Sequence, residues 1–331
     1  MGRRRARIVV VTGASAGVGR ATAIEFARQG ARVALLARGA AGLAGARIDV
    51  ERAGGEALEL PTDVGDAEQV ETAAREIEER WGAPEVWVNA AMATVFSPAW
   101  RITPEEFRRA TATTYLGTVH GTLAALRRME RAGRGVIVQV SSALSYRSIP
   151  LQAPYCGAKF AVRGFTESLR CELLHERSPV RLTMVHLSAF NTPQFEWARS
   201  HMERLPKPVP PVYAPEVAAR AIAWAADHRR RDVYVGAPAL KTVIASRLLP
   251  GALADRIAAD RAWAGQLLPE RAAGERPDNL ESPIPRDFGV RGRFNDTRRH
   301  SVQFALSRHR TPLLAAAGVA VLAMLLGARS R

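Results

Sequence analysis

Short apolar runs alternate with longer amphipathic stretches along the first 236 residues of the chain. The apolar runs are rich in β-branched residues and predict strands at residues 7–11, 32–37, 56–60, 86–89, 136–141, 180–187 and 232–235. The stretches with helical periodicity lie between them, at residues 17–29, 41–53, 67–80, 104–131, 154–177 and 215–227. Strands that alternate with helices in this way predict one α/β domain, a doubly wound parallel seven-stranded sheet of the Rossmann type.

The pattern changes after residue 236. Residues 239–268 predict one or two helices, broken at Pro250-Gly251. Residues 269–311 are rich in Pro, Gly and Arg without sustained periodicity, which indicates either a linker or an irregular wrap around the domain. We therefore expect a domain over residues 1–236, a helical and then irregular basic extension over 237–310, and a hydrophobic tail over 311–331.

Composition narrows the class of protein. A hydrophobic content of 47% and a charged content of 24% are typical of a packed globular chain. The net charge of +15 resides mainly at the two ends, because Arg3, Arg4, Arg5 and Arg7 contribute four charges and residues 286–331 contribute a net seven. The middle of the chain is close to neutral, so we predict no nucleic-acid partner.

The two cysteines, Cys156 and Cys171, lie fifteen positions apart in one predicted helix, about 22 Å along its axis. They cannot form a disulfide with each other. With neither a disulfide framework nor the spacing of metal ligands, the sequence favours a reducing compartment and predicts no metal site.

A glycine-rich turn directly follows the first predicted strand and opens the first helix. It reads Thr12-Gly13-Ala14-Ser15-Ala16-Gly17-Val18-Gly19. Glycines allow a pyrophosphate to approach the backbone, and the helix start supplies free N–H groups and partial positive charge. The turn predicts a nucleotide site, although such a turn can also occur without a ligand.

A second group of residues carries acid–base chemistry. Tyr155 and Lys159 lie four positions apart, so they project from one face of a predicted helix, and Ser142 follows the fifth strand. A tyrosine ordinarily titrates near pH 10, and a neighbouring lysine cation favours its phenolate form. This arrangement predicts a site for proton transfer.

These motifs together resemble the classical short-chain dehydrogenase/reductase family over residues 7–236. The residues that carry the resemblance are the turn from Thr12 to Gly19, Asp63-Val64, Asn89-Ala90-Ala91, Ser142, Tyr155-Cys156-Gly157-Ala158-Lys159 and Asn191-Thr192-Pro193. The resemblance implies that Tyr155 is the general acid/base and that Ser142 orients and polarises the substrate oxygen. It also implies that Lys159 binds the nicotinamide ribose and lowers the pKa of the tyrosine.

The same resemblance implies the remaining site residues. Besides Thr12, Gly13, Ser15, Gly17, Val18 and Gly19 of the turn, Asp63 and Val64 would hold the adenine, Asn89 would line the cofactor cleft and Thr192 would hold the carboxamide. Thr114 stands where the family has a catalytic asparagine that binds a water of the proton relay, so slower turnover is expected. A homo-oligomer is also expected from the resemblance.

The end of the second predicted strand bears on the cofactor. An NAD enzyme places an acidic residue there to bind the ribose 2′-hydroxyl. This chain has Ala37 at that position, followed by Arg38, whose guanidinium suits a 2′-phosphate. NADP(H) is the predicted cofactor, the alternative being that Arg38 is only a surface charge.

The loop after the sixth strand predicts part of a substrate pocket. Its apolar residues are Phe190, Phe195, Trp197, Met202 and Leu205, followed by prolines between residues 206 and 211. A lid of this kind would cover a lipophilic molecule, although the same residues could merely pack a flexible flap. The sequence does not distinguish a steroid, a retinoid, a fatty-chain carbonyl or another alcohol.

The tail from Leu313 to Ala328 has no polar side chain. The uncharged stretch 311–328 would make a helix of about 27 Å, close to the thickness of a bilayer core, and arginines flank it. This predicts a membrane anchor that holds the catalytic domain on the cytoplasmic side, with a helix docked on the domain or in a dimer interface as the alternative. We thus expect a tethered NADP-dependent alcohol dehydrogenase or carbonyl reductase, and alternatively a weakly active scaffold at the membrane.

Overall fold

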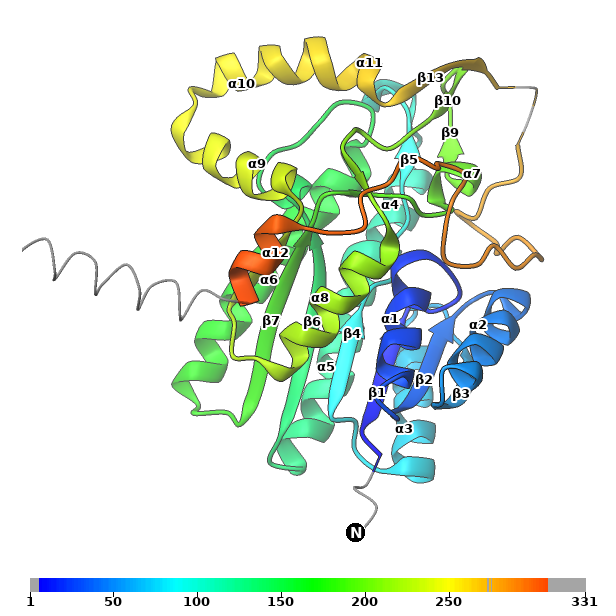
Figure 1. Cartoon of the computed structure of the whole chain (residues 1–331), viewed down its shortest axis with the longest axis vertical. Helices are drawn as coiled ribbons and strands as arrows, with labels where there is room; N and C mark the ends of the chain where they lie inside the picture. Colours follow the sequence, from blue (N-terminus) through cyan, green and yellow to red (C-terminus); the bar gives the residue numbers. More distant parts are fainter. Residues whose placement is uncertain (1–5, 273, 275, 309–331) are drawn as a thin grey trace, which may run out of the picture.

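The computed structural model describes residues 6–272, 274 and 276–308. Its centre is a parallel seven-stranded sheet with the strand order β12-β7-β6-β4-β1-β2-β3 (Figure 1). The strands are β1 (Ile8–Thr12), β2 (Arg32–Ala37), β3 (Glu56–Pro61), β4 (Val86–Asn89), β6 (Gly135–Ser142), β7 (Val180–Leu187) and β12 (Asp232–Val235). This confirms the predicted fold, a single doubly wound domain whose strand order reverses between β1 and β4.

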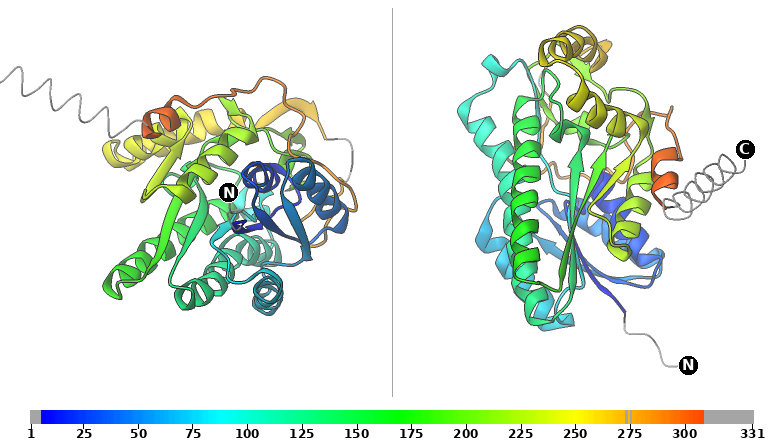
Figure 2. Two further views of the ribbon diagram at one scale, coloured as in Figure 1. Left: turned by 60° about the horizontal axis from the view of Figure 1, so that its bottom comes forward. Right: turned by 90° about the vertical axis from the view of Figure 1, so that its left-hand side faces the viewer.

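Helices cover both faces of the sheet, as the right-hand view of Figure 2 shows. They are α1 (Gly17–Ala27), α2 (Ala40–Arg52), α3 (Ala67–Trp81), α4 (Pro104–Thr111), α5 (Gly117–Arg131), α6 (Ala153–His175) and α8 (Pro215–Asp227). One core lies under α1, α2 and α8 and includes Phe26, Leu43 and Ile222. The other lies under α3, α5 and α6 and includes Ile77 and Leu169. Strands buried on both faces explain the continuous apolar runs in the sequence.

The stretch predicted as one helix over residues 104–131 has an irregular centre. Thr103 and Glu106 form a capping box that begins α4. One turn of π-helix, Ala112–Leu116, then separates α4 from α5. A π-helical turn contains one residue more than an α-helical turn. Hydrophobic periodicity does not reveal it, since the apolar stripe continues on either side of the turn.

Short strands connect the loops at the carboxyl end of the sheet. β5 (Val95–Phe96) pairs with β9 (Arg199–Ser200), and β8 (Ala189–Phe190) pairs with β11 (Val212–Tyr213). These pairs, with the short helix α7 (Gln194–Trp197), hold the loop after β7 above the sheet. The sequence does not predict them, because two-residue strands have no periodicity to read.

The extension after β12 begins with α9 (Ala237–Leu248), which ends just before the predicted break at Pro250-Gly251. It continues through α10 (Gly251–Ile257), a π-helical turn (Ala258–Ala262), α11 (Trp263–Gly265) and β13 (Leu267–Arg271), which pairs with β10 (Arg204–Pro206). An irregular segment then crosses back over the domain to α12 (Val302–Arg308) (Figure 1). In the described part of this segment, the backbone accepts hydrogen bonds from Arg38 and Arg109 of the domain.

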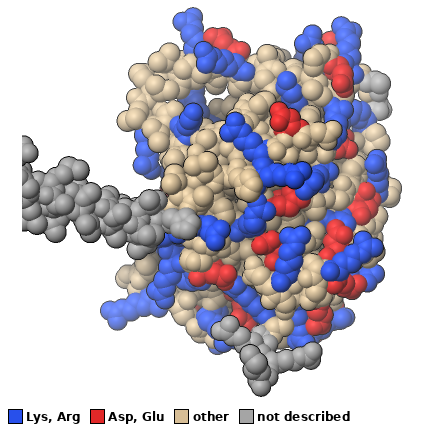
Figure 3. Space-filling model, viewed as in Figure 1, with Lys and Arg blue, Asp and Glu red and all other residues tan. Residues whose placement is uncertain are grey.

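The described part of the chain contains no helix long and apolar enough to cross a membrane. The predicted anchor, residues 311–331, lies outside the described residues. Lysine and arginine side chains are interspersed with acidic ones over the face shown in Figure 3, so this face has no broad patch of one charge.

Candidate active site

A cavity of about 410 Å³ opens at the carboxyl end of the sheet. Its size is within the range typical of small-molecule sites. It brings together most of the residues that the sequence predicts for the site. Those that line it are Gly13, Ser15, Gly17, Val18, Gly19, Arg38, Asp63, Val64, Ser142, Tyr155, Lys159 and Thr192.

The glycine turn fits a pyrophosphate because its backbone has no room for side chains. A Cβ on Gly19 would lie 2.2 Å from the carbonyl oxygen of Gly13, and one on Gly13 would lie 2.8 Å from Cα of Ala91. Gly13 and Gly17 also have φ angles of 68° and 55°, in the left-handed region. No side chain caps α1 at Ala16, and although the Gly17 N–H donates to the Gly289 carbonyl at 3.1 Å, the positive end of the helix dipole faces the turn and favours an anion there.

Two residues expected at the cofactor hold the framework and do not line the cavity. The Thr12 hydroxyl accepts hydrogen bonds from the backbone N–H of Ala90 at 3.1 Å and of Ala91 at 3.2 Å. The Asn89 side chain is buried among Trp87, Thr122 and Gln139 and hydrogen-bonds with each of them. Both side chains therefore position the loop after β4, whose Ala90, Ala91 and Met92 line the cavity.

Ser142, Tyr155 and Lys159 converge on the cavity from two elements. Ser142 ends β6, and its hydroxyl accepts a hydrogen bond from the Leu144 N–H at 3.1 Å. Tyr155 and Lys159 lie in the first turns of α6, with the lysine Nζ 5.6 Å from the centre of the tyrosine ring. The Lys159 ammonium donates to the Val140 carbonyl at 2.7 Å. The helical spacing therefore places a phenol, a hydroxyl and an ammonium around one space.

Burial controls how these groups titrate. Desolvation raises the pKa of Tyr155 well above its ordinary value, and a hydrogen bond with Ser142 partly opposes this rise. Desolvation also lowers the pKa of Lys159 to about 8. Tyr155 thus keeps its proton at neutral pH and is poised as an acid. The hydrogen bond with Ser142 favours the phenolate form of Tyr155.

Thr114 lies in the π-helical turn and is fully buried. Its hydroxyl donates to the Ala93 carbonyl at 3.1 Å and accepts from the Ala93 N–H at 2.9 Å. These two bonds fix the loop after β4, and the side chain does not line the cavity. Its neighbour Thr113 does line the cavity, with a buried hydroxyl that has no hydrogen-bond partner among the described residues. Sequence reasoning missed Thr113, although it adjoins the position it singled out.

The nucleotide end of the cavity contains Arg38 and Asp63. Asp63 pairs with Arg109 at 2.5 Å and accepts a hydrogen bond from the Gly65 N–H. Arg38 donates to backbone carbonyls of the C-terminal wrap, at Asn279, Leu280 and Glu281. No sequence pattern indicated these partners, because they lie about 240 residues further along the chain.

The other end of the cavity is more apolar. Its lining includes Leu144, Ile149, Phe190, Phe195, Trp197, Val209 and Pro210. Met202 and Leu205 from the predicted lid do not line it. The lining of the cavity also includes the polar side chains of Gln152, Gln194 and Lys207.

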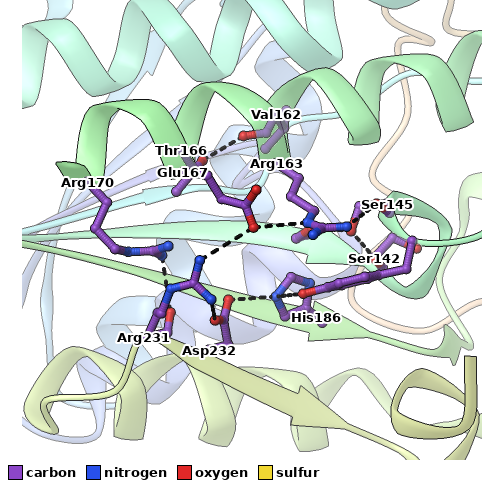
Figure 4. Close-up of polar contacts among 12 residues, drawn as sticks. Ser142, Ser145, Val162, Arg163, Thr166, Glu167, Arg170, His186, Arg231 and Asp232 are labelled. Carbon is purple, nitrogen blue, oxygen red and sulfur yellow. Dashed lines mark hydrogen bonds and ion pairs between the residues drawn. The ribbon is translucent and has the colours of Figure 1, made fainter. Parts of the chain in front are cut away.

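A polar cluster lies behind Ser142, between α6 and the β7–β12 edge of the sheet (Figure 4). His186 is buried and hydrogen-bonds with Asp232 at 2.9 Å. Burial lowers the pKa of His186, so the neutral ring donates its Nε2 proton to the carboxylate. The Ser145 hydroxyl donates to the Ser142 carbonyl at 2.7 Å, and Arg163 contacts the Ser145 carbonyl. Ser145 and Arg163 therefore support the turn that carries Ser142.

A doubly wound sheet with a glycine turn and an adjacent Ser, Tyr and Lys defines a nucleotide-dependent oxidoreductase. The model of the short chain dehydrogenase family matches residues 7–203. The chain belongs to this family and is an NAD(P)-dependent short-chain oxidoreductase.

Individual relatives agree with this assignment. The chain is 36% identical over 255 residues to the uncharacterized oxidoreductase YxnA of Bacillus subtilis, covering 76% of this chain and 71% of the relative. An alcohol dehydrogenase of the archaeon Thermococcus sibiricus, solved with 5-hydroxy-NADP, superimposes with a TM-score of 0.61 at 27% identity, over 69% of this chain and 95% of that one. A metagenomic short-chain oxidoreductase in complex with NADP gives a TM-score of 0.59 at 25% identity, over 69% and 96% of the two chains.

Proposed function

We propose that this protein interconverts an alcohol and a carbonyl on a lipophilic substrate, with NADP(H) as its cofactor and Tyr155 as general acid/base. The observation that carries the proposal is the convergence of Ser142, Tyr155 and Lys159 on the cavity that the glycine turn also lines. The apolar lining at the far end of the cavity supports a substrate with a hydrophobic body.

The chain's own residues supply orientation and the proton. When bound, NAD(P)H supplies the hydride that adds to the carbonyl carbon. The Ser142 hydroxyl orients the substrate oxygen, and the Tyr155 hydroxyl donates its proton to that oxygen, which leaves a phenolate. The Lys159 ammonium, held by the Val140 carbonyl, stabilises that phenolate until a proton returns. Alcohol oxidation reverses each step.

A panel of ketones and aldehydes, each assayed with NADPH and with NADH, tests this function. We expect cofactor oxidation with at least one apolar carbonyl. The competing hypothesis is a weakly active scaffold that binds the nucleotide. Tight nucleotide binding with no turnover anywhere in the panel would favour the scaffold.

Replacing Arg38 with alanine is expected to reduce a preference for NADPH over NADH by about one to two orders of magnitude, because a charge-assisted contact with the 2′-phosphate is lost. The relatives solved with NADP-type cofactors support this preference. Fluorescence titration of both cofactors measures it. Arg32→Ala is the matched control, since Arg32 lies at the other end of β2 and pairs with Glu56. Equal affinities in the unmodified protein would refute the cofactor assignment.

We also propose, from the sequence of residues 313–328, that the tail attaches the protein to a membrane. The full chain is then expected to sediment with membranes, to resist extraction by high salt and to be released by detergent, because salt screens charges but does not reverse apolar burial. Complete release by salt would contradict the anchor.

A further inference from the structure

A segment of the C-terminal wrap, residues 278–289, runs along the nucleotide end of the cavity. We call this segment the strap. In Figure 1 it is part of the orange-brown chain near the upper end of α2. Its residues Asn279, Pro283, Ile284, Arg286 and Phe288 line the same cavity as the glycine turn, so the strap is a wall of the proposed cofactor site.

Arginines of the catalytic domain hold the strap by its backbone carbonyls and by its carboxylates, among them Glu281, which lies 3.9 Å from Arg109. Arg38 donates to the carbonyls of Leu280 at 3.1 Å and Glu281 at 2.8 Å. Arg109 donates to the Leu280 carbonyl at 3.0 Å, and Arg20 pairs with Asp287. The strap is therefore latched to residues that surround the nucleotide end.

The strap also contacts the glycine turn directly. The Gly17 N–H, at the start of α1, donates to the Gly289 carbonyl at 3.1 Å. A Cβ built on Gly39 would lie 3.2 Å from Cβ of Pro283, and one on Gly45 would lie 2.1 Å from a carboxylate oxygen of Asp287. The surface under the strap thus has small residues where the strap lies closest.

Both ends of the strap also contact the apolar end of the cavity. The Asn279 N–H donates to the Trp197 carbonyl at 3.1 Å, and Asp278 pairs with Arg199 at 2.9 Å. The Phe288 ring packs edge-on against Trp197, with ring centres 4.7 Å apart. The strap therefore spans from the nucleotide end to α7.

The attachment is polar and has little apolar support. Leu280 is the buried hydrophobic residue of the strap, whereas Glu281, Ser282, Pro283, Pro285, Arg286 and Asp287 are exposed. Although its hydrogen bonds are partly buried, a surface segment with few buried apolar side chains opens at a lower free-energy cost than the core of the sheet. The strap can thus lift while the sheet and its two cores stay folded.

We propose that the strap is the roof of the cofactor site and that the cofactor enters and leaves only when this roof lifts. The proposal rests on the proposed function in one respect, that a nicotinamide dinucleotide occupies the cavity. Because the strap and the glycine turn line one cavity, the proposal requires that the closed strap and the bound cofactor coexist. Arg38 then has two partners, the strap carbonyls and the cofactor, and couples closure to binding.

A disulfide staple tests this. A Cβ at position 39 would lie 3.2 Å from Cβ of Pro283, a few tenths of an ångström under the roughly 3.5–4.5 Å range of disulfides, so a small shift of the strap lets Gly39→Cys and Pro283→Cys join it to the domain. The exposed Cys171 is replaced by serine, and the buried Cys156 is left in place. Oxidation without cofactor is expected to slow NADPH association by roughly tenfold or more. Oxidation with NADPH bound is expected to slow its dissociation by a similar factor, and a reductant should reverse both effects.

Stopped-flow NADPH fluorescence measures the rates, and mass spectrometry of the unreduced protein verifies the bond. The two single-cysteine variants, treated alike, are the controls. If the rates of NADPH association and dissociation were unchanged in a protein whose disulfide is verified, the proposal that the strap covers the cofactor site would be wrong. A staple that forms freely without NADPH but is blocked by it would also overturn it, because the strap would then occupy the cofactor's place. If the parent protein bound neither NADPH nor NADH, the proposed function would fail instead.

A second variant gives a test that does not depend on the staple. Asp287→Asn removes the ion pair with Arg20 and is expected to speed NADPH dissociation roughly two- to fivefold, the range of a partly exposed pair. Asp296→Asn, at an exposed aspartate outside the strap, is the matched control. If NADPH dissociated from the Asp287→Asn variant at the parent rate, the ion pair with Arg20 would not hold the strap closed.

Discussion

Replacing Tyr155 with phenylalanine is expected to lower kcat by about 10²- to 10⁴-fold, the usual contribution of a positioned acid, while NADPH binds almost as before. The substitution removes only the hydroxyl that transfers the proton and keeps the ring that packs beside Lys159. Steady-state kinetics with the best carbonyl of the panel, together with fluorescence titration of NADPH, measures both effects.

Tyr213→Phe is the matched control for this experiment. Tyr213 is also buried, and its hydroxyl accepts a hydrogen bond from the Ala237 N–H away from the cavity lining. This control should keep most of the activity. If Tyr155→Phe retained the parent kcat, another group would be the acid and the assignment of Tyr155 would be wrong.

Replacing Lys159 with methionine is expected to stabilise the protein and to inactivate it. The ammonium is buried, and desolvation lowers its pKa from 10.5 to about 8, so folding at neutral pH works against the charged form. This penalty is roughly 3 kcal/mol at most, and losing the hydrogen bond to Val140 offsets about 1 kcal/mol of the gain. We therefore expect the free energy of unfolding at pH 7 to rise by about 1 to 2 kcal/mol. The loss of the cation beside the reacting tyrosine should lower kcat by about 10²-fold or more.

The stabilisation by Lys159→Met depends on pH. Below pH 8 lysine is protonated in both the folded and the unfolded state, so the burial penalty is full. As the pH rises from about 8 to 10.5 the folded state loses the proton first, and the penalty disappears. Denaturant unfolding at pH 7 and near pH 10 should therefore show the stabilisation shrinking as the pH rises.

Lys241→Met, at an exposed lysine of α9, is the control for both measurements and should change neither strongly. A Lys159→Met protein less stable than the parent at pH 7 would show that the ammonium is better accommodated than its burial indicates. Such a result would mean that Lys159 does not lower the stability of the protein in return for activity.

The sequence by itself determined the order of strands and helices along the sheet-forming domain. A strand buried on both faces requires a continuous apolar run, and a helix that covers the sheet requires an apolar stripe. Both patterns lie within a short stretch of sequence and can be recognised there. The positions of the glycine turn, Ser142, Tyr155 and Lys159 were equally predictable. Strand ends and helix faces place these residues, and in a parallel sheet the carboxyl ends of the strands meet at one edge.

Only the tertiary structure decided which predicted residues line the cavity and what Arg38 contacts. The side chains of Thr12, Asn89 and Thr114 form hydrogen bonds with other residues of the domain and do not line the cavity. Buried polar groups form hydrogen bonds with the partners that the fold places beside them. Arg38 contacts carbonyls of the strap, more than 240 residues away, and no local pattern encodes that proximity. A segment without periodicity docks through its backbone and a few charges, so its place over the cavity arises from the assembled surface and not from its own sequence.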